Sequence, residues 1–278
     1  MNKINKKERL YVLIIVLIIG LISIYPMIWM FFNSFKGTAE ILGDGGGLIP
    51  EVWQPENYTN ALEAAPFLKY MWNSLWTTAL IVGLQLFLSA LLAYALTQFQ
   101  FKGRDVIFGI VLGTYMLPSA VTYIPSFVLL SRMNLTDSLW GLVFSNLANV
   151  FMIFLLRQNF KSTSKEVIEA ARVEGVSEWS ILWRIVVPMN RNTIINASLI
   201  SFIANFNSYL WPSILLMSRD NYVIQQGLNQ FSTSSGSFTS TFPLSMAATA
   251  LTVVPLIIVY ILLQRYFVGT SGQSTVKG

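Results

Sequence analysis

The chain alternates long apolar stretches with short segments that carry its charge. No Asp, Glu, Lys or Arg occurs in six of these stretches, which are residues 10–35, 70–101, 106–131, 138–156, 192–218 and 221–264. A helix that crosses the hydrocarbon core of a bilayer needs about 20 predominantly apolar residues, so each stretch is long enough. The last one opens with the polar run NYVIQQGLNQFSTSSGSFTSTF, which favours a loop at 219–242 before the final helix.

The pattern predicts an all-α integral membrane protein in which residues 1–278 form a single transmembrane domain. We expect six transmembrane helices, at about 10–35, 71–97, 106–130, 138–156, 193–217 and 243–266. Composition agrees, because 11% of the residues are charged and the mean hydropathy is +0.58, whereas a soluble domain carries about 25% charged residues.

Basic residues indicate the orientation of the spans. With a cytoplasmic N-terminus, four of the 18 Lys and Arg residues lie outside the membrane, namely Lys36, Lys69, Arg132 and Arg219. The other 14 lie inside, which is the bias that basic residues show toward the cytoplasm. Both termini are then cytoplasmic. The net charge of +5 follows from this topology and requires no nucleic-acid partner; membrane lipid is the surrounding medium.

The inventory of reactive side chains argues against an enzyme. The chain has no Cys and no His, which excludes disulfides, thiolate chemistry and imidazole metal sites. Carboxylates are left for acid–base chemistry, and none lies within a predicted span. The sequence also has no G-x-x-x-x-G-K-[ST] loop to hold nucleotide phosphates. We therefore expect no catalytic residue, metal or cofactor in this chain, and any ATP must be used by another polypeptide.

Polar side chains within the spans are candidates for a solute pathway. In the fifth span Ser198, Ser201, Asn205 and Ser208 share one side of a helix at three- and four-residue spacing. Such groups either make hydrogen bonds between helices, at about 0.6 kcal/mol each, or line a path for an uncharged polar solute. The sequence leaves both readings open. The candidate pathway residues are Asn146, Asn149, Ser201, Asn205, Asn207 and Tyr209.

The segment 157–191 differs from the rest because it is charged and helical in pattern. Its core, STSKEVIEAARVEGVSEWSILWRIVVP at 162–188, predicts two short helices around a turn. Thr163 and Glu166 have the spacing of a capping box, Gly175 can adopt the left-handed conformation that ends a helix, and Ser177 can cap the second helix. The first helix is expected to bury an apolar face made of Val167, Ile168, Ala171 and Val173.

This first helix could lie on lipid headgroups or bind a protein. Glu166, Glu169 and Glu174 make it acidic, and anionic lipid would repel them. A protein partner with a basic pocket is therefore favoured.

The run EAARVEGVSEWSILWRIVVP resembles the EAA motif of binding-protein-dependent ABC importer permeases, with matches at Glu169, Ala170, Ala171, Gly175 and Pro188. The resemblance covers nearly the whole chain and is specifically to the smaller, maltose-permease-like subunit of the carbohydrate-uptake branch. It includes ENYTNAL, AYALTQFQFKGR, MLPSAVTYIPSFVLL, FMIFLLRQNF and the tail FVGTSGQSTVKG. The chain departs from that branch at NFNSYLWP in the fifth span, where a Trp-Asn pair is common, and at Gln-Ser-Thr in the tail, where Gly-Ala-Val is common.

The resemblance implies a function and a set of partners. The segment 157–191 would hold the coupling helix that sits in a cleft of an ATPase, with Glu166, Glu169, Ala170, Ala171, Gly175 and Pro188 as its residues. The chain would work with a second homologous permease, two ATPase subunits that bind ATP and Mg²⁺, and an external sugar-binding protein that the segment 219–242 reaches. It would lie in the bacterial cytoplasmic membrane and import an oligosaccharide or glycoside. The alternative function is a self-sufficient secondary carrier or facilitator for a polar solute.

Overall fold

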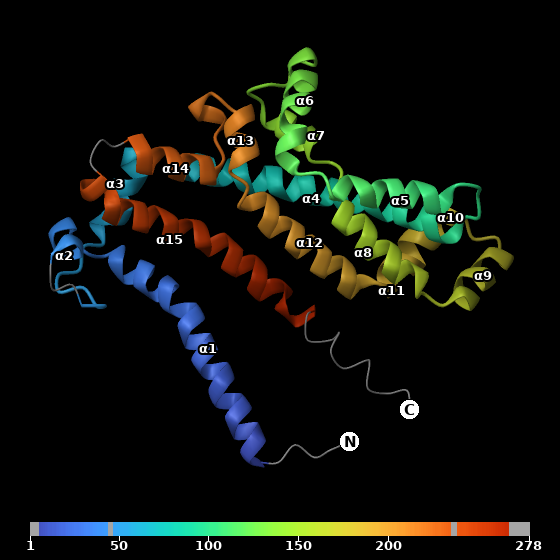
Figure 1. The fold of residues 1–278 in the computed structure, drawn as a ribbon, viewed down its shortest axis with the longest axis horizontal. Helices are drawn as coiled ribbons and strands as arrows, with labels where there is room; N and C mark the ends of the chain where they lie inside the picture. Colours follow the sequence, from blue (N-terminus) through green and yellow to red (C-terminus); the bar gives the residue numbers. More distant parts are fainter. Residues whose placement is uncertain (1–5, 44–46, 235–237, 267–278) are drawn as a thin grey trace. The chain divides into compact units, whose positions relative to one another are not determined.

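The computed structural model describes residues 6–43, 47–234 and 238–266, and in this part of the chain all regular structure is helical (Figure 1). The prediction of an all-α fold is confirmed at this level. The longer helices are α1 Lys6–Asn33, α3 Glu56–Ala64, α4 Phe67–Gln98, α5 Arg104–Tyr115, α6 Ser119–Arg132, α7 Leu139–Ser145, α8 Val150–Lys161, α9 Lys165–Val173, α12 Arg191–Phe206, α14 Ile224–Ser234 and α15 Phe238–Leu263. The shorter elements are α2 Thr38–Leu42, α10 Glu178–Ile181, the π-helical η1 Leu182–Val186, α11 Val187–Met189, α13 Leu210–Leu215, η2 Arg219–Asn221 and η3 Gln264–Tyr266.

Three helical segments of the described residues are long and apolar enough to cross a membrane: Arg9–Asn33, Phe67–Gln98 and Thr241–Leu263. Two further pairs meet the same requirement when each bent pair is taken as one crossing. These pairs are α5 with α6, bent by 100°, and α7 with α8, bent by 45°. The described chain therefore has three candidate spans, or up to five.

One bend follows from a proline, and the other lies where one helix ends and a capped helix begins. Pro118 stands directly before α6, where it lacks a backbone N–H and disfavours helical geometry in the residue before it. Between α7 and α8 the chain leaves the helix, and Asn149 then caps α8 by accepting a hydrogen bond from the Met152 N–H at 3.0 Å. The expected span 193–217 is likewise divided, because α12 ends at Phe206 and α13 begins at Leu210.

The segment 219–242, expected to be a loop, is largely helical in the structure. It forms η2, then α14, and the start of α15, while residues 235–237 lie outside the described residues, as does the tail 267–278. The α4 helix holds its first part. Asn73 donates to the carbonyls of Asp220 and Tyr222, both at 3.0 Å, and the Ser74 hydroxyl accepts from the Ile224 N–H at 2.7 Å. The polar residues that suggested a loop are thus used in helix and side-chain bonding.

The chain divides into two compact units, each described by itself. The first unit comprises residues 1–68 and 228–254, and the second comprises residues 69–227 and 255–278. In the first unit the Asn57 side chain joins α3 to the end of α1 by donating to the carbonyls of Ser34 at 3.0 Å and Lys36 at 2.9 Å.

The second unit contains two hydrophobic clusters of buried side chains. One cluster joins α4 and α8 to α9, α10, η1 and α12, and comprises Ala90, Ala93, Tyr94, Met152, Leu156, Phe160, Ile168, Ala171, Ile181, Leu182, Val186, Ile194 and Ala197. The other joins α4 to α6, α7 and α13 and comprises Ile81, Leu130, Leu142, Val143, Trp211, Leu215, Leu216 and Val223. The first cluster supports the charged segment 157–191, so it positions the site described below.

Asp137 ties two connections of the second unit together. It has a positive φ of 52°, and its carboxylate accepts from the backbone N–H groups of Met217 and Ser218, each at 2.9 Å. Burial raises the pKa of this carboxyl, but hydrogen bonds from Ser218, Met217 and Asn221 outweigh burial and hold the pKa below its ordinary value. Asp137 therefore stays ionised and bonded at neutral pH.

A substitution at Gly141 tests how closely α7 approaches the connection that precedes it. A Cβ at this position would lie 2.0 Å from the Leu135 carbonyl oxygen, whereas a Cβ at Gly83 in α4 would meet nothing within 4 Å. Gly141→Ala should therefore destabilise the protein by about 1–3 kcal/mol, the usual cost of overpacking. The measurement is thermal unfolding of the purified chain in detergent, followed by tryptophan fluorescence.

Gly83→Ala is the matched control for this substitution, because alanine favours a helix over glycine by about 1 kcal/mol. Its midpoint temperature should stay level or rise. Equal midpoints for the two variants would contradict the packing described for α7.

Candidate functional site

The charged segment forms a helical hairpin whose turn is made at Gly175. This residue has a φ of 77°, and the N–H groups of Gly175 and Val176 donate to the carbonyls of Arg172 and Ala171, both at 3.0 Å. Ser177 then caps α10 by accepting from the Ser180 N–H at 3.4 Å. The predicted turn at Gly175 and the predicted cap at Ser177 are confirmed.

The capping box expected at Thr163 and Glu166 is wrong. The α9 helix begins at Lys165 after Ser164, with no side-chain capping bond. Thr163 is buried, and its hydroxyl accepts instead from the Asn190 side chain at 2.9 Å. The residue with capping chemistry is therefore used to fasten the hairpin to the connection that leads into α12.

The α9 helix has one buried side and one exposed side. Ile168 and Ala171 are buried in the first hydrophobic cluster, as predicted. Val167 and Val173, which were expected on that buried face, are 43% and 89% exposed, so this part of the prediction is wrong.

The opposite side, called here the exposed face of α9, consists of Glu166, Glu169, Ala170 and Val173. These four residues recur at three- and four-residue spacing and so share one side of the helix. The face combines two carboxylates, a small residue and an apolar residue.

The second limb of the hairpin is anchored along its length. Ile181, Leu182 and Val186 are buried in the first cluster. Trp183 stacks on Phe87 of α4, with ring centroids 5.6 Å apart and 8° between the planes. The limb does not end at Pro188, because α11 continues to Met189 after the π-helical turn η1. Pro188 itself is exposed.

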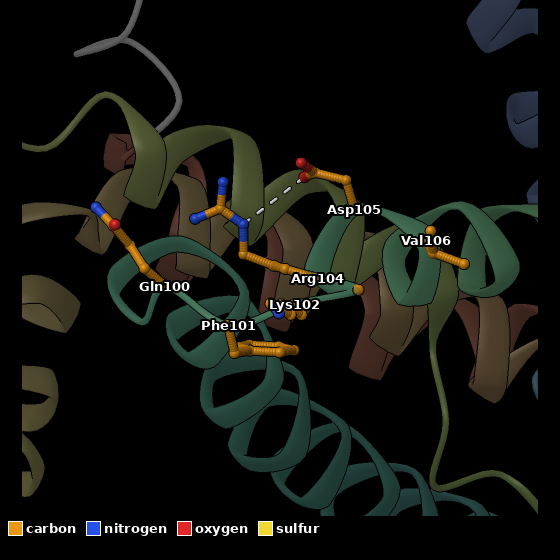
Figure 2. Close-up of a pocket in the computed structure, with 7 residues that line it drawn as sticks. Gln100, Phe101, Lys102, Arg104, Asp105 and Val106 are labelled. Carbon is orange, nitrogen blue, oxygen red and sulfur yellow. Dashed lines mark ion pairs between the residues drawn. The ribbon is translucent and has the colours of Figure 1, made fainter.

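A polar turn between α4 and α5 lies beside the hairpin. Figure 2 shows the residues around its cavity of about 510 Å³, with the ion pair between Arg104 and Asp105 at 3.7 Å. Arg157 of α8 also reaches Asp105, at 3.1 Å, and its guanidinium lies 3.8 Å from the centroid of the Phe108 ring.

Glu169 borders a second cavity, of about 430 Å³, between this turn and α9. Its charged lining residues are Arg104, Asp105, Arg157, Lys161, Lys165, Glu169 and Arg172. Among the residues that the structure describes, no basic group lies within the 4.0 Å that defines an ion pair with Glu169. Glu169 is also exposed, so its carboxylate is available to a partner.

Four of the predicted pathway residues meet in one hydrogen-bond network around the buried side chains of Gln85 and Ser201. Asn149 donates to the Gln85 side-chain oxygen at 3.1 Å and to the Ser201 hydroxyl at 3.4 Å, and Ser201 donates to the same Gln85 oxygen at 2.5 Å. Gln85 donates in turn to the Asn146 carbonyl at 2.6 Å. Asn205 joins by donating to the Ser201 carbonyl at 2.8 Å. The network links α4, the α7–α8 break and α12.

A small polar cavity adjoins this network. It has a volume of about 10 Å³ and is lined by Ser74, Thr77, Thr78, Ile81, Leu142, Asn146, Asn205, Ser208, Pro212 and Val223. That volume is about the space of one water molecule, which is far too small for a sugar. In this conformation the polar side chains are therefore closed on one another.

Asn207 and Tyr209 lie apart from the other four pathway residues, at the break between α12 and α13. Asn207 accepts from the Gln225 side chain at 3.1 Å, and both Asn207 and Tyr209 are exposed. The structure does not bring them into the buried network.

Gln85 is the central residue that the sequence did not single out. It is 4% exposed and bonds to three of the predicted residues. Two signals could have found it. Gln85 shares one helix face with the buried Ser74, Thr78 and Ser89, and a long amide within a span must find its partners within the protein.

Comparison with known proteins relates this architecture to transport systems. Residues 85–269 match the protein family described as the binding-protein-dependent transport system inner membrane component. The chain is 32% identical to the diacetylchitobiose uptake system permease protein of Streptomyces coelicolor, over 93% of this chain and 85% of that protein. It is 28% identical to the arabinooligosaccharides transport system permease protein of Halalkalibacterium halodurans, over 94% of this chain and 93% of that protein. A chain of a bacterial ABC transporter involved in alginate import, solved as a crystal structure, has 25% identity and a TM-score of 0.83, with 96% of this chain and all of that chain covered.

Gln85→Met tests whether the network stabilises the fold. Methionine has a similar length but cannot accept from Asn149 and Ser201 or donate to Asn146. Leaving these buried groups unpaired should cost about 1–3 kcal/mol. Thermal unfolding in detergent should show a lower midpoint than the parent chain.

Gln100→Met makes the same chemical change at an exposed position of the α4–α5 turn and should leave the midpoint unchanged. A Gln85→Met protein as stable as the Gln100→Met control would mean that the network contributes nothing to stability.

Proposed function

Because the chain belongs to the family of inner membrane components of binding-protein-dependent transport systems, we propose that it is a permease subunit that imports a sugar with the help of separate ATPase subunits. The substrate is an oligosaccharide or a glycoside. Relatives named for diacetylchitobiose and arabinooligosaccharides support this class, as does the likeness to the alginate importer.

The exposed face of α9 is the observation that carries this proposal. Glu166, Glu169, Ala170 and Val173 stand on a helix whose other side is fixed in a hydrophobic cluster. A small residue at Ala170 lets a partner backbone approach closely, and Glu169 offers a carboxylate to a basic group of the partner. The face therefore docks in the cleft of an ATPase, with Ala171 and Gly175 setting its position from below and Pro188 lying in the second limb.

The remaining partners follow from this role. The chain pairs with a second homologous permease, and the pair binds two ATPases that hold ATP and Mg²⁺. A sugar-binding protein docks on the opposite side of the membrane; the family's description as binding-protein-dependent supports such a partner. The membrane is the bacterial cytoplasmic membrane.

Six membrane crossings with both termini in the cytoplasm complete the proposal. The bent pairs α5–α6 and α7–α8 each count as one crossing, and α12 with α13 supplies the sixth despite its break. This topology puts the α9 hairpin on the cytoplasmic side, where an ATPase has access. The basic residues of the chain support the same orientation.

The buried network forms the closed state of the sugar pathway in this proposal. Asn149 and Asn205 bond to Ser201 here, and Asn146 joins them through its backbone carbonyl and Gln85. These residues would exchange such bonds for sugar hydroxyls when the pathway opens. Asn207 and Tyr209 would meet the sugar at the break between α12 and α13.

Glu169→Lys should abolish coupling to the ATPase. Breaking one side of a partly buried ion pair across an interface costs about 2–5 kcal/mol. At about 1.4 kcal/mol per tenfold, association should weaken by tens to thousands of fold. The measurements are the amount of ATPase that copurifies and the ATP hydrolysis stimulated by sugar-loaded binding protein.

Glu63→Lys is the control, because it reverses an exposed charge on α3, on the opposite side of the membrane in this topology. It should leave both quantities unchanged. Normal copurification and normal stimulated hydrolysis with Glu169→Lys would sink the proposal, and so would sugar transport by the chain reconstituted alone.

Single cysteines can test the topology, because the chain contains none of its own. In intact cells or spheroplasts, a membrane-impermeant maleimide should label Glu63→Cys but not Ser164→Cys. Both positions are exposed in the structure, so burial cannot explain a failure to react. After the membrane is permeabilised, Ser164→Cys should react as well. The reverse labelling pattern would overturn the proposed orientation.

A further inference from the structure

The carboxylate of Glu178, in the second limb of the hairpin, accepts hydrogen bonds from Arg172 of the first limb and from Tyr94 of α4. Arg172, at the end of α9, donates to Glu178 through Nε to Oε1 at 2.7 Å and through Nη2 to Oε2 at 3.2 Å. The Tyr94 hydroxyl of α4 donates to the same Oε2 at 2.5 Å. Glu178 stands at the start of α10, so its carboxylate joins α9, α10 and α4 in a single contact.

The contact borders the first hydrophobic cluster. Tyr94 is buried in the same cluster as Ile168 and Ala171 of α9 and Ile181 of α10. Glu178 and Arg172 are partly exposed, with side chains 38% and 34% accessible. The apolar contacts of the cluster stabilise the packing of α9 and α10 on α4 but do not fix the position of one helix along another. A bidentate Arg–carboxylate pair, in contrast, has a defined geometry.

Both charged groups remain ionised at neutral pH. The hydrogen bond from Arg172 lowers the pKa of the Glu178 carboxyl; burial raises it less, and the Tyr94 bond lowers it further. The same hydrogen bond raises the pKa of the Arg172 guanidinium. The contact is therefore present throughout the physiological pH range.

The backbone alone would leave the hairpin less constrained. Its turn depends on Gly175, where a Cβ would meet no other atom within 4 Å, so this residue is not packed and only the adjoining Val176 contacts the first cluster. Arg172 and Glu178 lie on either side of that turn and bridge it. Val173, on the exposed face of α9, is the next residue after Arg172, so the bridge holds the docking surface at its attachment point.

We propose that Tyr94, Arg172 and Glu178 act as a positioning clamp that makes the exposed face of α9 move together with α4. This inference rests on the proposed function. The same α4 helix carries Gln85, the centre of the buried polar network, nine residues before Tyr94. At a rise of 1.5 Å per residue, about 14 Å of continuous helix separates the two. A displacement of the hairpin by the ATPase would thus reach the network through one rigid element and one side-chain contact.

Tyr94→Phe is the sharpest test, because it keeps the ring in its cluster and removes the hydroxyl that reaches Glu178. The variant is reconstituted with its ATPase subunits and binding protein in proteoliposomes, and ATP hydrolysed per sugar transported is measured. We expect this ratio to rise by at least about fivefold, the lower end of typical coupling between two sites. Copurification of the ATPase should be normal. Glu178→Gln should raise the ratio as well, because it weakens the bond to Arg172.

Tyr123→Phe is the matched control, since it removes a tyrosine hydroxyl from α6 and keeps the ring stacked on Trp211. Its ratio should equal that of the parent chain. An unchanged ratio with Tyr94→Phe would overturn the clamp. A proportional fall of hydrolysis and transport would overturn it too, because it indicates only a structural role. The proposed function is tested separately, since Glu169→Lys would still block ATPase binding if the clamp alone were wrong.

Discussion

The burial of Ile168 and Ala171 against α4 and α8 decides what the hairpin can present to a partner. With these two side chains in the hydrophobic cluster, the helical period turns Glu169, Ala170 and Val173 outward. The long membrane helix and the docking surface therefore share one core. The proposed transfer of motion from an ATPase depends on that shared core, because a surface helix held by polar contacts alone would yield before α4 moved.

Within the membrane, broken helices impose the complementary constraint. The carbonyl of Asn146 is freed where α7 ends, and Gln85 supplies the donor that it would otherwise lack. Each hydrogen bond between such helices is worth only about 0.6 kcal/mol, so a network of this kind holds one arrangement without preventing another. The groups that stabilise the break are the same groups that a polar solute would need.

The sequence predicts the helical class, the hairpin and its Gly175 turn from local chemistry, because each depends on a few adjacent residues. It does not predict which face of α9 is buried, since Val167 and Val173 are as apolar as Ile168 and only the neighbouring helices distinguish them. The capping box fails for a similar reason: Thr163 has a tertiary partner in Asn190. Pro118 indicates a bend but not its angle of 100°, and the polar face that Gln85 shares with Ser74, Thr78 and Ser89 does not show which helices it meets. Long-range contacts decide all of these features.

The π-helical turn at Leu182–Val186 bears on how such a chain can change over evolutionary time. A π turn holds one residue more than an α-helical turn, because its backbone bonds join residues five apart. Deleting one residue there would restore an α-helix and leave the polypeptide on either side facing much as before, because the π turn holds its extra residue within about one full turn. The same deletion in a regular α-helical turn would rotate the polypeptide before it by about 100° and draw it in by about 1.5 Å. A single-codon deletion in the π turn is thus a change of length that leaves the side chains of α9 facing the same partner.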